Sequence, residues 1–196
     1  METRLVPGLE QTRKLIYSMG VSLDGFIAGP GGDLKWSAPD EELHRFHNEE
    51  MRKTGANLYG RRLYEVMTYW ETAEEDPSIS DYEREFARIW KETPKIVFSK
   101  TLEKVEGNYR LVRDDVAEEV AKLKEQPGKD LAVGGAGLAS TFIKLGLVDE
   151  YRMFVRPVVL GGGTPYFPAL DERIDLELVE TRTFGSRVVY LRYRRA

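Results

Sequence analysis

The chain has 196 residues and no cysteine, and its 29 Lys and Arg against 33 Asp and Glu give a formal net charge of −4. The absence of cysteine excludes disulfides, iron–sulfur clusters, thiolate zinc sites and cysteine nucleophiles. The mildly acidic balance argues against wholesale binding to nucleic acid or to an anionic membrane, because both need a basic surface. No window approaches the ~20 apolar residues of a membrane span and no secretory signal precedes the first strand, so we expect a cytoplasmic protein.

The first two thirds of the chain alternate strands and helices. A first strand is predicted at residues 14–19, and the glycine- and proline-rich stretch 20–36 follows it. A helix is predicted from Asp40 to about Gly55, because Asp40 can cap it and acidic residues favour a helix N-terminus. Further strands are predicted at 56–59, 95–99, 109–112 and 131–133, and further helices at 62–69, 81–91, 115–125 and 136–145.

The last third has a different pattern. An apolar strand is predicted at 151–160, and two strand-like runs, 176–184 and 187–195, flank the turn Gly185-Ser186. The sheet should therefore be mostly parallel, with an antiparallel end. The apolar strand suits either a buried place in the sheet or a subunit interface, and we expect a homodimer.

No repeat, low-complexity segment or linker divides the sequence. Residues 13–196 are therefore predicted to form a single domain, and residues 1–12 a flexible tail.

Two familiar kinds of site are not indicated. His44 and His47 lie three apart, without the H-E-x-x-H spacing or a third ligand, so we predict no metal site. The chain has no G-x-S-x-G sequence, which argues against a serine hydrolase.

Three strand ends carry residues suited to phosphate. Residues 134–138 lead from an apolar strand into a helix through glycine and alanine, which suits an anion or an ordinary tight turn. Residues 60–62 (Gly-Arg-Arg) and 99–101 (Ser-Lys-Thr) combine basic side chains with hydroxyls or glycine. Because the carboxyl ends of parallel strands meet at one edge of a sheet, we predict that the three bind one extended nucleotide.

A nicotinamide cofactor would account for the shortage of catalytic side chains, since the cofactor itself carries the hydride. The proton would then come from water or from one of three acids, Asp24, Asp40 or Glu41. Each acid also has an ordinary use. Asp24 precedes Gly25 in a typical turn pair, and Asp40 is a typical helix cap.

Five stretches, in this order, resemble the dihydrofolate reductase-like superfamily, and within it the RibD C-terminal domain family. They are SLDGFIAGPGGDLKW, YGRRLYE, IVFSKTL, VGGAGLASTFI and GLVDEYRMFVRPVVLGGGTPYF, so the resemblance covers nearly everything from residue 14 onward. It implies an α/β fold, a three-layer α/β/α sandwich around a mixed, mostly parallel sheet with a C-terminal antiparallel hairpin. It also implies that NADPH binds across the strand ends.

The resemblance assigns a role to each candidate site residue. Gly20 and Ile27 are similar to positions that meet the nicotinamide amide, and residues 26–36 to a mobile loop over it. Arg61 and Arg62 correspond to residues that hold the 2′-phosphate of NADPH, and the Gly134–Gly135 peptide to one that is commonly cis. The implied cofactor-binding residues are Gly20, Ile27, Ala28, Trp36, Gly60, Arg61, Arg62, Ser99, Lys100, Thr101, Gly134, Gly135, Ala136, Gly137 and Leu138.

The sequence also departs from the family pattern. Leu63 stands where folate reductases have a hydroxyl residue, and Val133 where pyrimidine reductases of riboflavin synthesis have an acid. The main hypothesis is therefore an NADPH-dependent reductase of a small, heterocyclic or carbonyl-type substrate, with Asp40 or Glu41 as substrate anchor or proton donor and Asp24 as loop organiser. The alternatives are an NADP(H)-binding module without turnover, a chiefly structural homodimer, and a folate or pyrimidine reductase.

Overall fold

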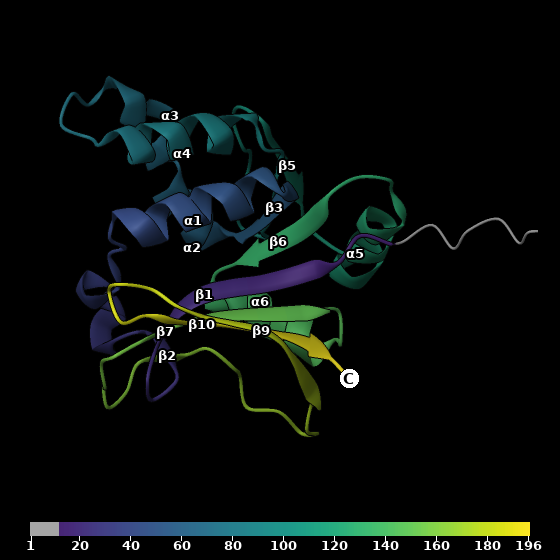
Figure 1. Ribbon diagram of the computed structural model, residues 1–196. Coiled ribbons are helices and arrows are strands. Elements are labelled where there is room, and N and C mark those ends of the chain that lie inside the picture. The colour runs from purple at the N-terminus through teal and green to yellow at the C-terminus, as the bar shows by residue number, and fades with distance from the viewer. Residues whose placement is uncertain (1–11) are drawn as a thin grey trace, which may run out of the picture.

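The computed structural model describes residues 12–196, and a single mixed sheet runs through its centre (Figure 1). Its eight strands have the order β5-β4-β3-β6-β1-β7-β10-β9. They are β1 (Leu15–Ser22), β3 (Thr54–Gly60), β4 (Lys95–Phe98), β5 (Tyr109–Val112), β6 (Asp130–Gly134), β7 (Glu150–Arg156), β9 (Leu176–Thr183) and β10 (Val189–Arg195). The tail predicted for residues 1–12 lies outside the described residues except for Thr12, which is exposed.

Neighbouring strands from β5 to β7 run parallel, whereas β10 is antiparallel to both β7 and β9. The predicted mostly parallel sheet with a C-terminal antiparallel hairpin is confirmed. The reason is that parallel neighbours need a long crossover, which the helices supply, whereas a short turn can join only antiparallel strands.

Helices cover both faces of the sheet. They are α1 (Glu41–Arg52), α2 (Arg61–Met67), α3 (Tyr69–Thr72), α4 (Asp81–Glu92), α5 (Val116–Glu125) and α6 (Ala136–Lys144), with short 3-10 turns η1 (Pro30–Gly32), η2 (Lys35–Ser37) and η3 (Ala73–Glu75). Among the described residues, no helix is both long and apolar enough to cross a membrane.

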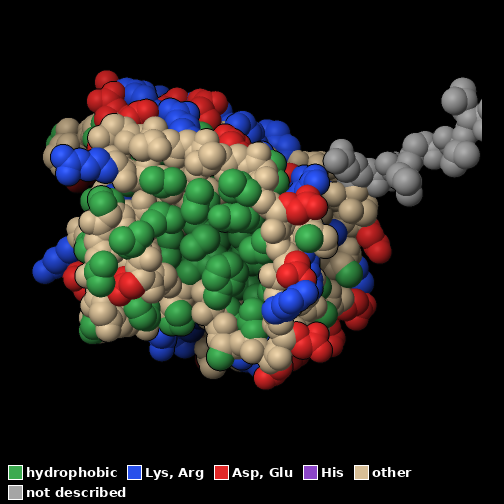
Figure 2. All heavy atoms as spheres, turned by 60° about the horizontal axis from the view of Figure 1, so that its bottom comes forward, with side chains coloured by type: hydrophobic (Ala, Val, Ile, Leu, Met, Phe, Trp, Pro, Cys, Tyr) green, Lys and Arg blue, Asp and Glu red, His purple; other side chains and the backbone are tan. Residues whose placement is uncertain are grey.

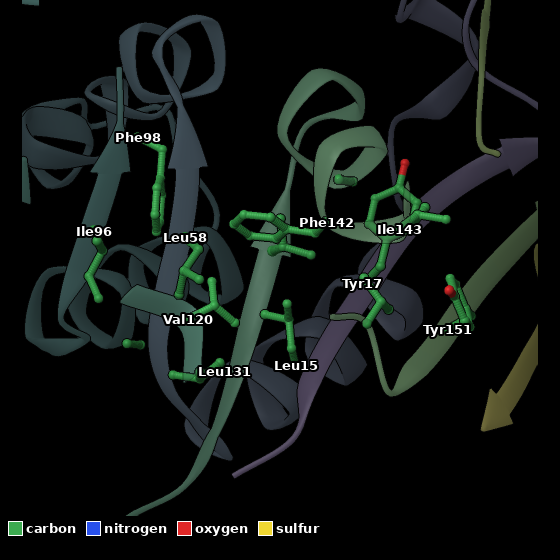
Figure 3. Close-up of a cluster of buried hydrophobic side chains, with 14 of the residues drawn as sticks. Leu15, Tyr17, Leu58, Ile96, Phe98, Val120, Leu131, Phe142, Ile143 and Tyr151 are labelled. Carbon is green, nitrogen blue, oxygen red and sulfur yellow. The ribbon is translucent and has the colours of Figure 1, made fainter. Parts of the chain in front are cut away.

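Adjacent residues of β3 show how the layers are divided. Leu58 packs with Val120 of α5 and Phe142 of α6 (Figure 3). Its neighbour Tyr59 points to the opposite face, where it packs with Trp90 of α4. Because side chains alternate along a strand, each face of the sheet has its own helical layer. This arrangement is the predicted three-layer sandwich.

Local capping sets where the helices begin. The Asp40 side chain accepts the Leu43 N–H at 3.0 Å and starts α1. Ser80 starts α4 through a capping box with Glu83. The helix predicted at 62–69 is wrong at its end, because α2 stops at Met67 and a separate turn, α3, follows.

A second, two-stranded sheet was not predicted. It pairs β2 (Phe26–Ala28) antiparallel with β8 (Thr164–Pro165), inside stretches that the sequence marks as loops. Gly163 permits this contact, because a Cβ there would overlap the carbonyl oxygen of Ala28. Strands this short give no alternating pattern, so only the fold reveals that the two loops are joined.

The connections change faces at one end of the sheet. β3 and β6 are neighbours, but α2, after β3, packs with Tyr59 on one face, whereas α6, after β6, packs on the other. In open α/β sheets, ligands bind outside the carboxyl ends of the strands where such a reversal occurs. This end of the sheet is therefore the place to look for a site.

Candidate functional site

The turns after β3 and β6 lie against each other at this end of the sheet. A Cβ on Gly60 would stand 3.6 Å from the Cβ of Leu138, and a Cβ on Gly134 would meet the Leu63 side chain at 2.5 Å. A Cβ at Gly134 would fit only if the Leu63 side chain shifted, whereas a Cβ at Gly60 would make an ordinary van der Waals contact. Two of the three predicted phosphate-binding stretches are therefore brought together.

The turn into α6 offers free backbone donors. Gly135 has a φ of +85°, which is favourable only for glycine, and Ala139 is the first residue whose N–H bonds back to the Gly135 carbonyl. The N–H groups of Ala136, Gly137 and Leu138 therefore have no intrahelical acceptor. A Cβ on Gly137 would meet nothing within 4 Å, so a ligand can approach here.

The expected cis Gly134–Gly135 peptide bond is wrong, because the described residues contain no cis peptide bond. The positive φ of Gly135 turns the chain from strand to helix with a trans bond.

The third predicted stretch joins the same end of the sheet. The Arg61 guanidinium donates to the Thr101 hydroxyl at 3.1 Å and to the Glu65 carboxylate at 2.7 Å. The Ser99 hydroxyl accepts the Thr101 N–H at 3.2 Å and so shapes the turn after β4. Arg62 and Lys100 are exposed nearby in sequence, which gives this corner a basic character.

The end of β1 meets an arginine from β7. The two strands pair in register, with Gly20 opposite Phe154, and the Arg156 Nε lies 4.0 Å from the position of a Cβ on Gly20. Arg156 donates to the Ala38 carbonyl at 3.0 Å through Nη1, but its Nε is buried and has no partner among the described residues. Burial lowers the pKa of Arg156, and the nearby charge of Asp40 partly offsets this.

His47 of α1 lies over the same part of the sheet. Its ring is 4.5 Å from the ring of Phe154, two residues before Arg156 on the same face of β7. Burial, and then the positive charges of His44 and Arg156, lower the pKa of His47 to about 4. The imidazole is therefore neutral at pH 7 and can both donate and accept a hydrogen bond.

The other histidine has a packing role. His44 lies 5.0 Å from the Tyr82 ring and 5.7 Å from the Phe86 ring, between α1 and α4. In the described part of the chain, no group of three or more potential ligands could hold a metal ion.

Each predicted acid has a structural partner. Asp24 accepts the backbone N–H groups of Leu160 and Gly161, Asp40 caps α1, and the exposed Glu41 forms an ion pair with Arg45 at 2.9 Å. The positions agree with Asp24 as a loop organiser. Because each of the three carboxylates already has a partner, none of them is placed as a free acid.

The predicted loop residues lie beside the end of β1. Ile27 and Ala28 are buried in β2, and the Trp36 indole N–H donates to the Asp33 carbonyl at 3.0 Å within the loop. Ser22 of β1 holds the loop, because its hydroxyl accepts the Phe26 N–H at 2.9 Å.

Arg156 and His47 were missed as site residues. Arg156 is the last residue of β7, but the sequence analysis placed it inside a longer strand, 151–160, and so did not mark it as a strand end. No sequence signal marks His47, whose place depends on how α1 packs against β7.

Comparisons with known proteins identify the family and the fold. The model of the RibD C-terminal domain matches residues 13–190. The chain is 40% identical over 182 residues to "Uncharacterized protein YyaP" of Bacillus subtilis (strain 168), covering 92% of this chain and 94% of that protein.

Two solved structures share the fold. A putative riboflavin biosynthesis protein from Shewanella sp. PV-4 matches with a TM-score of 0.73 at 22% identity, over 93% of this chain and 99% of that one. Dihydrofolate reductase from Enterococcus faecalis, complexed with NADP(H) and RAB-propyl, matches with a TM-score of 0.62 at 18% identity, over 93% and 96%. The resemblance inferred from the five sequence stretches is confirmed.

Proposed function

Because this chain belongs to the RibD C-terminal domain family, we propose that it is an NADPH-dependent reductase that transfers hydride to a small heterocyclic or carbonyl-type substrate. The observation that carries the proposal is the convergence of the Gly134–Gly135 turn, the Gly60–Arg61 turn and Thr101 at one end of the sheet. A dinucleotide is long enough to span these strand ends, and a smaller ligand would leave most of them unused.

The residues present fit the two charged parts of NADPH. The unpaired N–H groups of residues 136–138 and the positive end of α6 favour an anion, so this turn would hold the pyrophosphate. Arg61 and Arg62, with the Ser99 and Thr101 hydroxyls and the Lys100 ammonium, would hold the 2′-phosphate.

The nicotinamide half would lie at the end of β1. The backbone at Gly20 and Ile27 would bind its carboxamide, and the loop from Ala28 to Trp36 would cover it and exclude water. NADPH supplies the hydride, and the chain supplies position and shielding.

Arg156 and His47 are the polar groups left for the substrate. The buried, unpartnered Nε of Arg156 is a donor that a substrate oxygen would satisfy, and a cation there favours negative charge developing on that oxygen. The neutral His47 would orient the substrate by a hydrogen bond. The proton would come from water, since Asp24, Asp40 and Glu41 already have partners.

One observation favours the second candidate, an NADP(H)-binding module without turnover. The predicted carboxylates serve the loop, the helix cap and a surface ion pair, so none of the three is placed to protonate a substrate. A reductase oxidises NADPH when its substrate is added, whereas a binding module does not, so NADPH oxidation distinguishes the two candidates.

The first experiment is calorimetric titration with NADPH and, separately, with NADH. Selective binding of NADPH supports the cofactor site, and binding of neither contradicts both candidates. The second experiment follows the loss of NADPH absorbance with dihydrofolate and a panel of small aldehydes, ketones and heterocycles. Once a substrate is found, Arg156→Gln should raise its KM by about 10-fold or more, as expected for a lost charged hydrogen bond, and leave NADPH affinity nearly unchanged.

A further inference from the structure

A concave region lies at the end of the sheet opposite the proposed cofactor site. The turns of the cofactor site follow the carboxyl ends of β3, β4 and β6, whereas this region borders the amino ends of β3, β4 and β5 and the residues just before β1 and β6. Figure 1 shows α5 beside the start of β1 at this end. None of its residues takes part in the proposed reductase reaction.

Two cavities of about 610 and 660 Å³ form this region, which we call the amino-end groove. Arg13, Gly55 and Pro94 line both of them, so the two cavities adjoin. The first extends along α5 and the start of β5, and the second lies between the end of α4 and the turn before β6. Each has the volume of a small-molecule site, which is about 300–1,000 Å³.

Arg13, where the two cavities meet, is a buried cation. It is 8% exposed, its Nε donates to the Lys129 carbonyl at 2.5 Å, and its Nη1 donates to the Leu123 carbonyl at 3.4 Å. Among the described residues, its Nη2 has no hydrogen-bond acceptor and no carboxylate forms an ion pair with it. The Asp130 carboxylate accepts the Lys14 N–H at 2.8 Å instead.

The charge of Arg13 is therefore only partly compensated. The two carbonyl oxygens carry partial charges, and burial lowers the pKa of Arg13 while the charge of Asp130 offsets only part of this effect. Burying a charge is costly unless the charge is paired and hydrogen-bonded. An anion that enters the groove would supply the missing partner.

Two glycines leave space around this guanidinium. A Cβ on Gly55 would lie 2.6 Å from Nη2, and a Cβ on Gly128 would lie 3.8 Å from Nε. The Cβ on Gly55 would also lie 2.5 Å from the Lys129 carbonyl oxygen, so any side chain there would force the arginine or the backbone to move. Glycine at the start of β3 thus leaves Nη2 free to meet a ligand.

The groove also has an excess of positive charge. Six arginines and lysines line it, against two glutamates, Glu92 and Glu119. The cations are Arg13, Lys95, Arg110 and Lys122 in the first cavity, and Arg52 and Lys129 in the second. The chain as a whole has a net charge of −4, and in Figure 2 side chains of both signs lie at the margin of an apolar area. The excess of cations is therefore a local feature, opposite in sign to the whole chain.

The groove has an apolar wall as well. Ala56, Ile96 and Leu123, all buried, line the first cavity together with Arg13. A site that combines a buried guanidinium with an apolar wall suits a small molecule that has both an oxyanion and an apolar part. A nucleic acid would need a wide basic surface instead of a cavity of this size.

We propose that the amino-end groove binds a small organic anion, whose carboxylate or phosphate group pairs with the Arg13 guanidinium. Its apolar part packs against Ala56, Ile96 and Leu123. Guanidinium donors match carboxylate and phosphate oxygens equally well, so the shared chemistry is an oxyanion on an apolar body. The exposed Lys129 would attract the anion to the groove.

The test is a titration of the full ¹⁵N-labelled chain with benzoate and, separately, with phenyl phosphate, at an ionic strength held constant with NaCl. The two probes have the same apolar ring and differ in the oxyanion, so they distinguish a carboxylate ligand from a phosphate ligand. The backbone amide signals of Gly55 and Gly128 should shift and saturate with at least one probe. Signals of residues 135–137 report any binding of phenyl phosphate at the proposed cofactor site, so the two sites are measured separately.

Arg13→Gln should raise the dissociation constant of the probe by about 10-fold or more, as expected for lost hydrogen bonds between charged groups. Because Arg13 also bonds two carbonyl groups, a second variant at an exposed position guards against a folding defect. Lys129→Glu reverses one charge of the groove and should raise the dissociation constant by about threefold or more. The double variant Arg61→Ala and Arg62→Ala, at the opposite end of the sheet, is the control and should leave the Gly55 and Gly128 response unchanged.

Three results would overturn the proposal. They are shifts confined to residues 135–137, shifts at Gly55 and Gly128 that do not saturate with either probe, and wild-type affinity in a folded Arg13→Gln or Lys129→Glu protein. Neither probe is a nicotinamide cofactor, so failure here is separate from failure of the reductase proposal.

Discussion

The Asp24 carboxylate accepts the backbone N–H of Gly161 at 2.7 Å and thereby ties the segment after β1 to the segment after β7. Its other oxygen accepts the Ser22 hydroxyl at 2.7 Å and the Leu160 N–H at 3.1 Å. The Ser22 hydrogen bond, with those from Leu160 and Gly161, keeps the pKa of Asp24 below its ordinary value. The carboxylate therefore holds the loop that would cover the cofactor.

Asp24→Asn should loosen this connection without unfolding the protein. The amides of Leu160 and Gly161 should exchange faster with deuterium, because a neutral amide oxygen accepts hydrogen bonds more weakly than a carboxylate. Asp33→Asn, in the same loop, is the control and should leave that exchange unchanged, because the Asp33 carboxylate accepts the N–H of its local neighbour Lys35.

The pH dependence of this effect follows from the lowered pKa. Stability from the Asp24 carboxylate is present above the ordinary carboxyl value of 3.8 and is lost as the pH falls through the lower folded value. The wild type should have a higher melting temperature than Asp24→Asn at pH 7, and this difference should disappear in acid. An equal difference in melting temperature at neutral and acidic pH would contradict the role given to the Asp24 carboxylate.

Glu150 is the buried centre of a charge cluster. Its side chain is 1% exposed and accepts hydrogen bonds from Arg192 at 2.8 Å and Arg152 at 2.7 Å. Burial alone would raise the pKa of Glu150, but the Arg192 hydrogen bond and the Arg152 charge outweigh it and lower the pKa.

Glu150→Gln should lower the free energy of unfolding by about 3 kcal/mol, since it leaves two arginines without their shared partner. Urea denaturation measures the change. Glu177→Gln breaks an exposed pair with Arg194 on the same hairpin and should cost less than about 1 kcal/mol. Similar losses of unfolding free energy in the two variants would show that the burial of Glu150 does not increase what its ion pairs contribute to stability.

His47 should make stability fall in mild acid. Its folded pKa of about 4 lies below the ordinary 6.5, so the unfolded chain binds a proton first as the pH falls between these values. Stability from the neutral ring is complete above pH 6.5 and is lost toward pH 4.

The loss attributable to His47 between pH 7 and pH 5 should be about 2 kcal/mol. His47→Leu should remove that part of the pH dependence, as measured by urea midpoints at the two pH values. An unchanged slope would mean that the ring is accessible to protons in the folded protein.

The Arg61 and Arg62 pair should distinguish the two cofactors. Replacing both with alanine should weaken NADPH by about 10- to 100-fold, the worth of charged hydrogen bonds to a phosphate, and NADH much less. Calorimetric titration measures both. Arg88→Ala is the control, because Arg88 is an exposed arginine of α4 that pairs with Glu74 of η3. This variant should change neither affinity. Equal weakening of NADPH and NADH would overturn the 2′-phosphate assignment.

Most of the helices and strands, and the class of fold, follow from local patterns in the sequence. Apolar alternation, helix caps such as Asp40 and the hairpin turn at Gly185 act over a few residues, so each can be predicted locally. The glycine and basic strand ends at 60–62, 99–101 and 134–138 were also predictable, because parallel strands end at one edge.

Which side chains meet depends on contacts between distant segments. Asp24 and Gly161 are 137 residues apart, and Arg156 reaches Gly20 only through the register of β7 on β1. The pairing of β2 with β8 depends in the same way on long-range packing. Local patterns specify periodicity and turns, whereas the register between distant strands is set by the burial of whole faces. For that reason the three acids took structural roles, and His47 lies against Phe154 and close to Arg156.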